Sequence, residues 1–261
     1  LLRGYIIEIT TDYLMVSLRN KSVDNDLFSL DIKWSIERDL IESSSKTLFR
    51  SIYEFIIASP EKKSILLGLS EPRFHHLKQL NIPELNTHQN QMLAKALASQ
   101  DYFLFQGPPG TGKTSYILKN LVQRIYEDTD ENILLLAYTN RAVDEICLAL
   151  QKISMDFPYI RIGSKYCTND SHNLLLSLID TLPLRDVYKK LKNTRVFVTT
   201  CSSAAANPEL FGLLTFDTLI IDEASQILEP QIIGFLAKTR RFIMIGDEKQ
   251  LPAVVIQDPS K

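Results

Sequence analysis

The stretch from Gly107 to Thr114, GPPGTGKT, has the residue types and spacing that bind the phosphates of a nucleotide. It satisfies GxxxxGK[ST] in full and follows an apolar run, YFLFQ, that reads as a strand. Its glycines let backbone N–H groups turn inward around a β-phosphate, and the helix expected next adds its positive N-terminal end. Lys113 is expected to reach the β- and γ-phosphate oxygens, and the Thr114 hydroxyl to bind Mg²⁺. The alternative is a glycine-rich turn that matches by chance. We predict a nucleoside-triphosphate site whose binding residues are Gly107, Pro108, Pro109, Gly110, Thr111, Gly112, Lys113 and Thr114.

Two adjacent carboxylates, Asp222 and Glu223, directly follow the apolar run TLII. Ligands of an open α/β sheet bind at the carboxyl ends of its strands, so this position suits a nucleotide site. We expect Asp222 to complete the Mg²⁺ shell and Glu223 to orient and polarise the attacking water. A second acidic pair, Asp144 and Glu145, is interpreted as solvated. A glutamate base and the lack of an NKxD segment favour ATP over GTP.

A further apolar run, residues 242–245, ends in the segment GDEKQLP. An amide at the end of a strand, here Gln250, is placed to contact a γ-phosphate and to respond to its loss. The alternative is a simple β-turn closed by Pro252. We therefore add Gln250 to the catalytic candidates Lys113, Asp222 and Glu223.

Short apolar runs alternate with amphipathic segments along residues 87–245. Strands are expected at 102–106, 133–138, 159–162, 195–200, 218–221 and 241–245, and helices at 87–99, 113–126, 141–152 and 230–237, with a polar helical insertion ending near residue 192. This alternation predicts an α/β fold with a parallel sheet covered on both faces. Upstream, residues 5–19 indicate a β-hairpin. Residues 34–59 indicate one long helix, or two broken at the serines 43–45, with Pro60 ending the pattern.

The chain of 261 residues is nearly neutral, with 29 basic and 31 acidic side chains. A neutral chain does not bind nucleic acid by bulk charge, so any such contact is local. The three cysteines lack disulfide or zinc spacing and indicate a reducing, intracellular compartment. No apolar run is long enough to span a membrane. One basic cluster surrounds Tyr188 and is interpreted as a solvated helix face, with a strand-binding helix as the alternative; its members are Arg185, Lys189, Lys190, Lys192 and Arg195.

Taken together, these segments resemble the motifs of superfamily 1 helicases. GPPGTGKT resembles motif I, LIIDEASQ resembles motif II and GDEKQLPAV resembles motif III. The upstream LNTHQ resembles the Q motif, which implies that Gln89 contacts the adenine edge. LLLAYTNRAVDEI resembles motif Ia, and VFVTTCSSAA resembles the next motif that contacts the nucleic-acid backbone. These two imply nucleic-acid contacts from Thr139, Asn140, Thr199 and Thr200, each of which is equally suited to capping a helix.

AxTNxAVD together with DEASQ is similar to the 5′-to-3′ branch that includes the nonsense-mediated-decay helicase, senataxin and the Okazaki-fragment helicase–nuclease. The resemblance implies a RecA-like P-loop NTPase domain at 81–261, preceded by a helical stalk and linker at 34–80 and part of a small β-barrel at 1–33. It also implies an ATP-hydrolysing helicase with ATP and Mg²⁺ as cofactors, single-stranded nucleic acid as partner, DNA favoured over RNA, and a cytoplasmic or nuclear location.

Such a motor also needs a second RecA-like domain, which carries motifs IV to VI and an arginine finger. Nothing after Pro252 resembles these motifs, and both ends of the sequence look cut from a longer chain. We therefore expect this piece to bind ATP, to hydrolyse it poorly and not to unwind a duplex. Two alternatives remain open at this point: an AAA+ type ATPase that acts on protein, and an ATP-binding nucleic-acid module without unwinding activity.

Overall fold

The computed structural model describes residues 4–18, 35, 42–108, 110–165, 172–247 and 249. The chain divides into two units, residues 1–46 and 47–261. In the first unit, β1 (Gly4–Ile9) pairs antiparallel with β2 (Leu14–Leu18), and the register shifts between Ile6 and Glu8. The predicted hairpin is therefore present. The boundary between the units falls inside helix α1 (Glu42–Ile56), and the predicted division at residues 33 and 80 stays a prediction.

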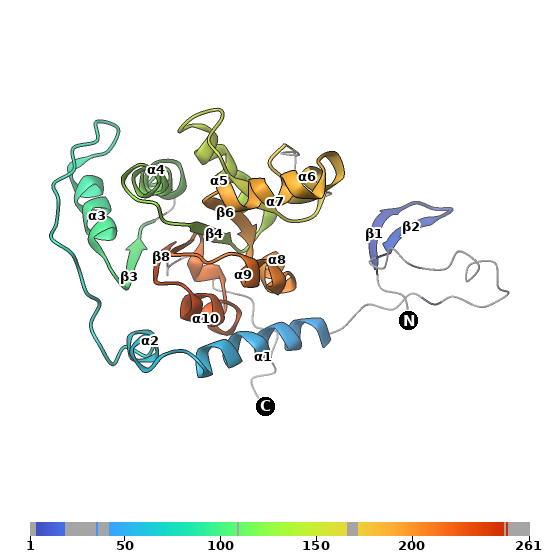
Figure 1. Ribbon diagram of the computed structural model, residues 1–261, viewed down its shortest axis with the longest axis horizontal. Helices are drawn as coiled ribbons and strands as arrows, with labels where there is room; N and C mark the ends of the chain where they lie inside the picture. The colour runs from blue at the N-terminus through green and yellow to red at the C-terminus, as the bar shows by residue number, and fades with distance from the viewer. Residues whose placement is uncertain are drawn as a thin grey trace. The chain divides into compact units, whose positions relative to one another are not determined.

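A six-stranded parallel sheet forms the centre of the second unit (Figure 1). Its order is β3-β8-β7-β4-β6-β5, and every neighbouring pair is parallel. The predicted α/β fold with a parallel sheet is thus confirmed. The strand bounds are β3 Tyr102–Gln106, β4 Ile133–Ala137, β5 Ile160–Ile162, β6 Val196–Thr200, β7 Thr218–Ile221 and β8 Arg241–Gly246.

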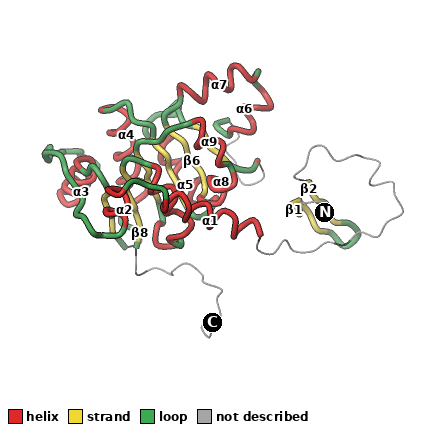
Figure 2. Tube along the Cα trace, turned by 60° about the horizontal axis from the view of Figure 1, so that its bottom comes forward, coloured by secondary structure: helices red, strands yellow, loops and turns green. Residues whose placement is uncertain are grey.

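Helices cover both faces of this sheet (Figures 1 and 2). Ile133, Leu135 and Ala137 of β4 belong to one buried cluster, which includes residues of α3 (Thr87–Ala98), α4 (Lys119–Asp128) and α5 (Asn140–Gln151). Leu134 and Leu136 belong to a second cluster on the opposite face. Because successive side chains of a strand point to opposite faces, a strand covered on both sides is apolar throughout. The second face is covered by α6 (Leu175–Thr181), α7 (Leu184–Asn193), α8 (Cys201–Ala206), α9 (Pro208–Leu213) and α10 (Glu229–Lys238).

Of the two expectations for residues 34–59, the described part supports one unbroken helix, which ends before Pro60. The serines at 43–45 lie within α1 and do not break it. Pro60 does not only end a helical pattern, because it is the first residue of α2 (Pro60–Leu66), whose N-cap is Ser59. Proline is well tolerated at the first helical position, where its missing N–H would have no intrahelical partner. Helices α8 and α9 were not expected, since six-residue helices carry little periodicity. Among the described residues, no helix is both long and apolar enough to cross a bilayer.

Candidate nucleotide site

The glycine-rich loop joins the end of β3 to a short π-helix, η2 (Lys113–Leu118), which runs into α4. Gly110 and Gly112 adopt left-handed φ angles of 77° and 76°. A Cβ on Gly112 would lie 2.5 Å from the Tyr116 ring, so this turn requires glycine. The Gly107 N–H donates a 3.1 Å hydrogen bond to the Gly246 carbonyl and ties the loop to the end of β8. The loop thus has the strand–loop–helix setting that its sequence predicts.

The polar side chains of the loop bond to its own backbone. Lys113 Nζ donates hydrogen bonds to the carbonyl of Gly107, at 2.5 Å, and to that of Pro108, at 3.3 Å. Thr111 Oγ1 donates to the Pro108 carbonyl at 2.8 Å. The Lys113 ammonium is therefore held at the mouth of the loop, where a phosphate oxygen can replace the carbonyls as its acceptor.

Thr114 and Asp222 meet across the site. The Thr114 hydroxyl donates a 2.6 Å hydrogen bond to Asp222 Oδ2. Asp222 directly follows β7 and is 2% exposed, and its Oδ1 accepts a 3.1 Å hydrogen bond from the Glu223 N–H. Burial raises the pKa of the Asp222 carboxyl above its ordinary value, while the Thr114 hydrogen bond acts in the opposite direction. The two predicted Mg²⁺ ligands thus lie within bonding distance of each other.

Glu223 has a left-handed backbone conformation, which the surrounding structure must stabilise. Its φ of 53° makes it the sole left-handed non-glycine residue among the described part of the chain. Such a conformation costs about 1–3 kcal/mol and clusters at functional sites. It begins a 3₁₀ turn, η4 (Ala224–Gln226), and the Gln226 side-chain amide donates a 3.2 Å hydrogen bond to Glu223 Oε2. This carboxylate is therefore turned out of the strand direction and held by Gln226, a residue that sequence reasoning did not single out.

Gln89 lies in the first turn of α3 and contacts the loop. Its Nε2 donates a 3.2 Å hydrogen bond to the Thr111 carbonyl. Its Oε1 accepts a 2.9 Å bond from the Asn86 N–H, and Asn86 caps the helix in return. The structure thus brings Gln89 to the edge of the predicted phosphate site, and its contact with adenine stays a prediction.

Two predicted site residues, Pro109 and Gln250, lie outside the described residues. Asp247, at the start of the same segment as Gln250, is 5% exposed, and its Oδ1 accepts a 3.0 Å hydrogen bond from the Lys249 N–H. Gly246 packs against the turn after Glu223, since a Cβ there would lie 3.2 Å from the Ser225 nitrogen. The start of the GDEKQLP segment therefore contacts both the loop and the acidic turn.

The four predicted nucleic-acid residues divide into three groups. Thr139 is the N-cap of α5 and its hydroxyl accepts from the Ala142 N–H at 3.1 Å, with exposed Asn140 next to it. Thr200 caps α8 in the same way through Ser203, at 3.0 Å. Thr199 is fully buried in β6. Contacts from Thr139, Asn140, Thr199 and Thr200 stay predictions.

The basic cluster around Tyr188 is not one surface. Arg195 donates hydrogen bonds to the carbonyls of Thr129, at 2.5 Å, and Tyr126, at 2.8 Å, and its guanidinium stacks 3.9 Å from the Tyr126 ring centre. It therefore closes the C-terminal end of α4 and belongs to the fold. The exposed cations are Arg185, Lys189, Lys190 and Lys192, all on α7.

The acidic pair Asp144–Glu145 is also not simply solvated. Asp144 forms an ion pair with Arg161, whose side chain is almost wholly buried in β5. Glu145 pairs with Arg141 one helical turn earlier, at 3.4 Å. Asp144 is thus the partner of a buried charge, which is costly to leave unpaired.

Two oxygen ligands suit a Mg²⁺ ion that is shared with a nucleotide. Among the described residues, no group of three or more His, Cys, Asp or Glu side chains could hold a metal. Mg²⁺ in nucleotide sites keeps several waters and binds one or two protein side chains together with the phosphates. The Thr114 hydroxyl and the Asp222 carboxylate, 2.6 Å apart, fit that donor set.

A parallel sheet, a phosphate loop after β3 and an acidic residue after β7, which β8 separates from β3, define a P-loop NTPase with a RecA-like fold. The family described as AAA domain matches residues 84–182 and 185–258. The chain belongs to this family.

Relatives of known name match most of the chain. It is 32% identical to the DNA replication ATP-dependent helicase/nuclease DNA2 of Bos taurus, over 97% of this chain and 25% of the relative. The helicase/nuclease JHS1 of Arabidopsis thaliana is 30% identical, over 97% of this chain and 20% of its own length. Saccharomyces cerevisiae DNA2 is 35% identical over 68% of this chain and 11% of its length. The chain thus spans about a quarter or less of these relatives, and the predicted resemblance to superfamily 1 helicases is confirmed.

Proposed function

We propose that the chain is the first motor domain of an ATP-dependent helicase or translocase that acts on single-stranded nucleic acid, and on DNA rather than RNA. The observation that carries the proposal is the bond between Thr114 and Asp222, which brings the phosphate loop and the acidic turn into one site. The names of the relatives, DNA replication ATP-dependent helicase/nucleases, support both ATP and DNA.

In this site Lys113 binds the β- and γ-phosphates, and Thr114 and Asp222 hold Mg²⁺, which neutralises charge on the phosphates. Glu223 accepts a proton from the attacking water and orients it, while Gln226 keeps the carboxylate in place. Gln89 fixes the loop at Thr111. Gln250 couples the γ-phosphate to the strand-binding surface, which is made by Thr139, Asn140, Thr199 and Thr200.

A second RecA-like domain of the full-length chain is proposed to complete the site across a cleft. Closure of the two domains on ATP and their reopening after hydrolysis would then step the strand. Without that domain, turnover by residues 1–261 is expected to be slower by a factor of about 10³ or more, as when an arginine finger is lost.

The test is strand separation by the full-length protein, measured on duplexes with a 5′ or a 3′ single-stranded tail, of DNA or RNA. We expect ATP-dependent unwinding of the 5′-tailed DNA. The AAA+ alternative, action on protein, has no support from the relatives named above. ATP hydrolysis that no nucleic acid stimulates, with no unwinding of any substrate, would refute the proposal.

A further inference from the structure

One continuous segment links the acidic turn to the GDEKQLP segment. It runs from η4 through α10 and β8, so that Glu223 precedes its start and Asp247 follows its end. Residues of α1 and α2 bind this segment at separate points along it. The position of the segment therefore depends on α1 and α2, two helices that precede the strands of the sheet in the chain.

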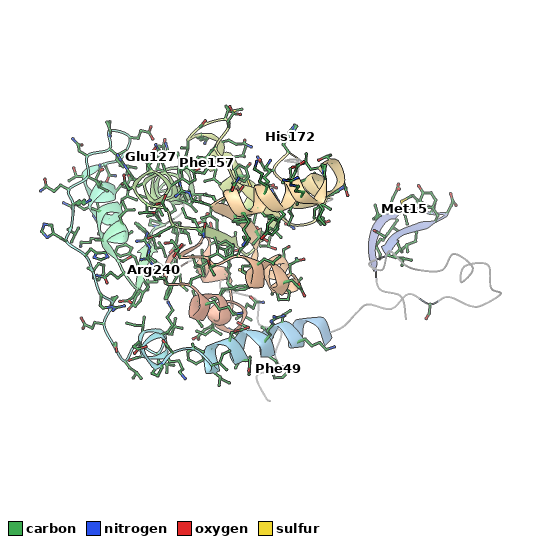
Figure 3. All side chains as sticks on the ribbon, in the orientation of Figure 1. Met15, Phe49, Glu127, Phe157, His172 and Arg240 are labelled. Atoms are coloured by element: carbon green, nitrogen blue, oxygen red, sulfur yellow. The ribbon has the colours of Figure 1, made fainter. Side chains whose placement is uncertain are left out.

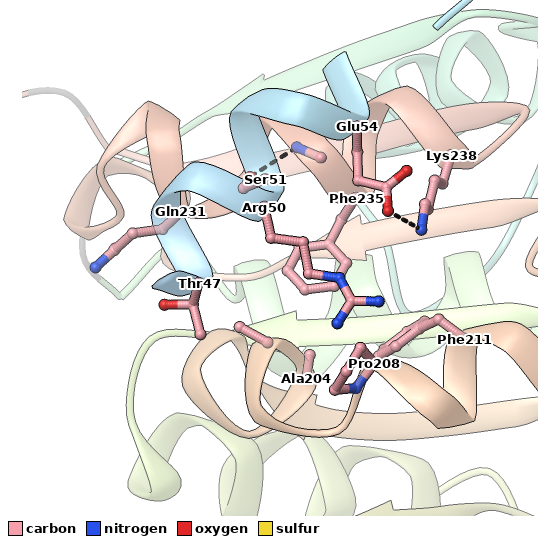
Figure 4. Close-up of a pocket in the computed structure, with 12 residues that line it drawn as sticks. Thr47, Arg50, Ser51, Glu54, Ala204, Pro208, Phe211, Gln231, Phe235 and Lys238 are labelled. Atoms are coloured by element: carbon pink, nitrogen blue, oxygen red, sulfur yellow. Dashed lines mark hydrogen bonds and ion pairs between the residues drawn. The ribbon is translucent and has the colours of Figure 1, made fainter. Parts of the chain in front are cut away.

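The closest contact joins Ser51 of α1 to Gly234 of α10. Ser51 Oγ accepts a 2.9 Å hydrogen bond from the Gly234 N–H, and Ser51 is only 9% exposed (Figure 4). A Cβ on Gly234 would lie 2.8 Å from Ser51 Cα and 2.9 Å from its carbonyl oxygen. Atoms do not approach so closely, so α1 can take this position only because residue 234 is glycine.

Two further contacts fix the same segment. Glu54, one turn after Ser51, forms a 2.6 Å ion pair with Lys238 at the end of α10 (Figure 4). Lys62 of α2 donates a 3.0 Å hydrogen bond to the Arg240 carbonyl and lies 5.5 Å from the centre of the Phe242 ring in β8. The segment is thus held at its middle and near the start of β8.

Helix α1 also faces the helix that forms the second half of the motif VFVTTCSSAA. A hollow is lined by Thr47 and Arg50 of α1, by Ala204 of α8 and by Phe211 of α9. Its lining also includes Gly234 and Phe235 of α10. The inner side of α1 therefore faces α8, which Thr200 caps, across this hollow, and it packs on α10. Phe49, which is 72% exposed, is on the side of α1 that faces away from the sheet (Figure 3).

We propose that Ser51 is a positioning residue for ATP hydrolysis, which acts through Gly234 on the placement of α10 and hence of Glu223 and Asp247. This rests on the proposed ATP hydrolysis. A helix moves as a rigid element, so a shift of α10 at Gly234 displaces the turn at its N-terminal end. Displacement of a reacting group by about 1 Å can cost up to 10²-fold in rate. A described hydrogen bond joins the loop to this segment, from the Gly107 N–H to the Gly246 carbonyl, whereas Lys113 and Thr114 bond to groups outside the segment, so ATP binding is expected to depend little on its position.

The experiment compares Gly234→Ala with Gly212→Ala in the full-length protein. Both glycines lie in helices, so alanine is favoured by helix propensity at both, by about 1 kcal/mol in the interior of α10 and by less near the end of α9. A Cβ on Gly212 meets nothing within 4 Å, whereas one on Gly234 meets α1. We expect Gly234→Ala to lower kcat for ATP about tenfold with KM for ATP within twofold of wild type. For Gly212→Ala, we expect kcat and KM both within twofold of wild type.

A folded Gly234→Ala protein with wild-type kcat overturns the proposal, even if its melting temperature is lower, because a purely structural contact would give that result. If Gly234→Ala does not fold, Ser51→Ala takes its place, since it removes the hydrogen bond and keeps the close approach. The expected result is again a lower kcat at unchanged KM, and a wild-type kcat overturns the proposal. A wild-type protein that hydrolyses no ATP would refute the proposed function instead.

Discussion

The hydroxyl of Thr114 donates a 2.6 Å hydrogen bond to Oδ2 of Asp222, a residue 108 positions later in the chain. Parallel strands bring their carboxyl ends to one edge of the sheet, and both residues follow such ends. The bond shows that the phosphate loop and the acidic turn form one site, which neither motif establishes alone. It also makes the protonation state of Asp222 important, because a buried carboxyl must be ionised to bind the proposed Mg²⁺.

The substitution Asp222→Asn should separate stability from activity. Burial raises the pKa of Asp222 above its ordinary value, so in the folded protein its ionised form is penalised at neutral pH. The folded state binds its proton more readily than the unfolded state, so this penalty shrinks as the pH falls toward the raised pKa. We expect the asparagine variant to have an equal or higher free energy of unfolding at pH 7, with kcat lowered at least about 10²-fold. Urea unfolding and steady-state ATPase assays check both; a less stable variant would contradict the burial argument.

The substitution Glu223→Gln should leave the affinity for ATP unchanged and strongly lower kcat for ATP hydrolysis. The amide keeps the size of the side chain but cannot accept the proton of the attacking water, so kcat should fall by roughly 10²–10⁴-fold. Affinity for ATP, measured by equilibrium titration, should stay within about threefold of wild type, because Glu223 is not expected to hold the phosphates. Gln226→Ala is the matched comparison, since it removes only the 3.2 Å bond to Glu223 Oε2 and should cost less. Equal kcat for Glu223→Gln and wild type would exclude this residue as the base.

Two substitutions at Thr139 distinguish helix capping from nucleic-acid contact. Thr139→Ala removes the cap of α5 and should cost about 0.5–2 kcal/mol of stability. Thr139→Asp keeps a capping oxygen but places a negative charge where a phosphate is expected. We therefore expect the aspartate variant to be as stable as wild type and to bind single-stranded DNA at least several-fold more weakly, by fluorescence anisotropy. Unchanged DNA affinity in the aspartate variant would leave Thr139 with a capping role alone.

Lys62→Met should stabilise the protein in a pH-dependent manner. Burial lowers the pKa of Lys62 from 10.5 to about 8, and the nearby Asp101 opposes this shift only in part. The unfolded state therefore binds more protons than the folded state between pH 8 and 10.5, and stability contributed by this residue rises with pH across that window. We expect Lys62→Met to raise the free energy of unfolding at pH 7 by about 1–2 kcal/mol. This figure is the gain from removing a buried charge minus the cost of losing the hydrogen bond to the Arg240 carbonyl. The gain should vanish near pH 10.5; a constant gain at both pH values would contradict the shift.

Local signals predicted the strands and the nucleotide loop well. Apolar runs such as ILLLA specify buried strands by themselves, and GPPGTGKT specifies its own loop. Residues whose partners lie far along the chain could not be assigned in this way. Arg195 looked like part of a basic surface because its acceptors, near residues 126 and 129, are distant in sequence. Asp144 looked solvated because Arg161 follows it by 17 positions.

The sequence analysis also did not predict that every residue of β6 is buried. β6 lies between β4 and β5 with helices on both faces, so all five of its residues are buried and no alternation marks the outward side. Thr199 and Thr200 therefore look equivalent in the sequence, although Thr199 lies within β6 and Thr200 ends this strand and caps α8. The contact of Ser51 with Gly234 has no local signal at all, since it depends on how α1 packs on α10.

The rate of ATP hydrolysis by the full-length protein, with and without saturating single-stranded DNA, tests the central claim most directly. A motor domain whose helices α5 and α8 begin at the proposed strand-binding residues should hydrolyse ATP at least tenfold faster when DNA is bound, and Lys113→Ala should remove this activity. Equal rates with and without DNA, and with and without RNA, would contradict the assignment of this chain to a nucleic-acid motor.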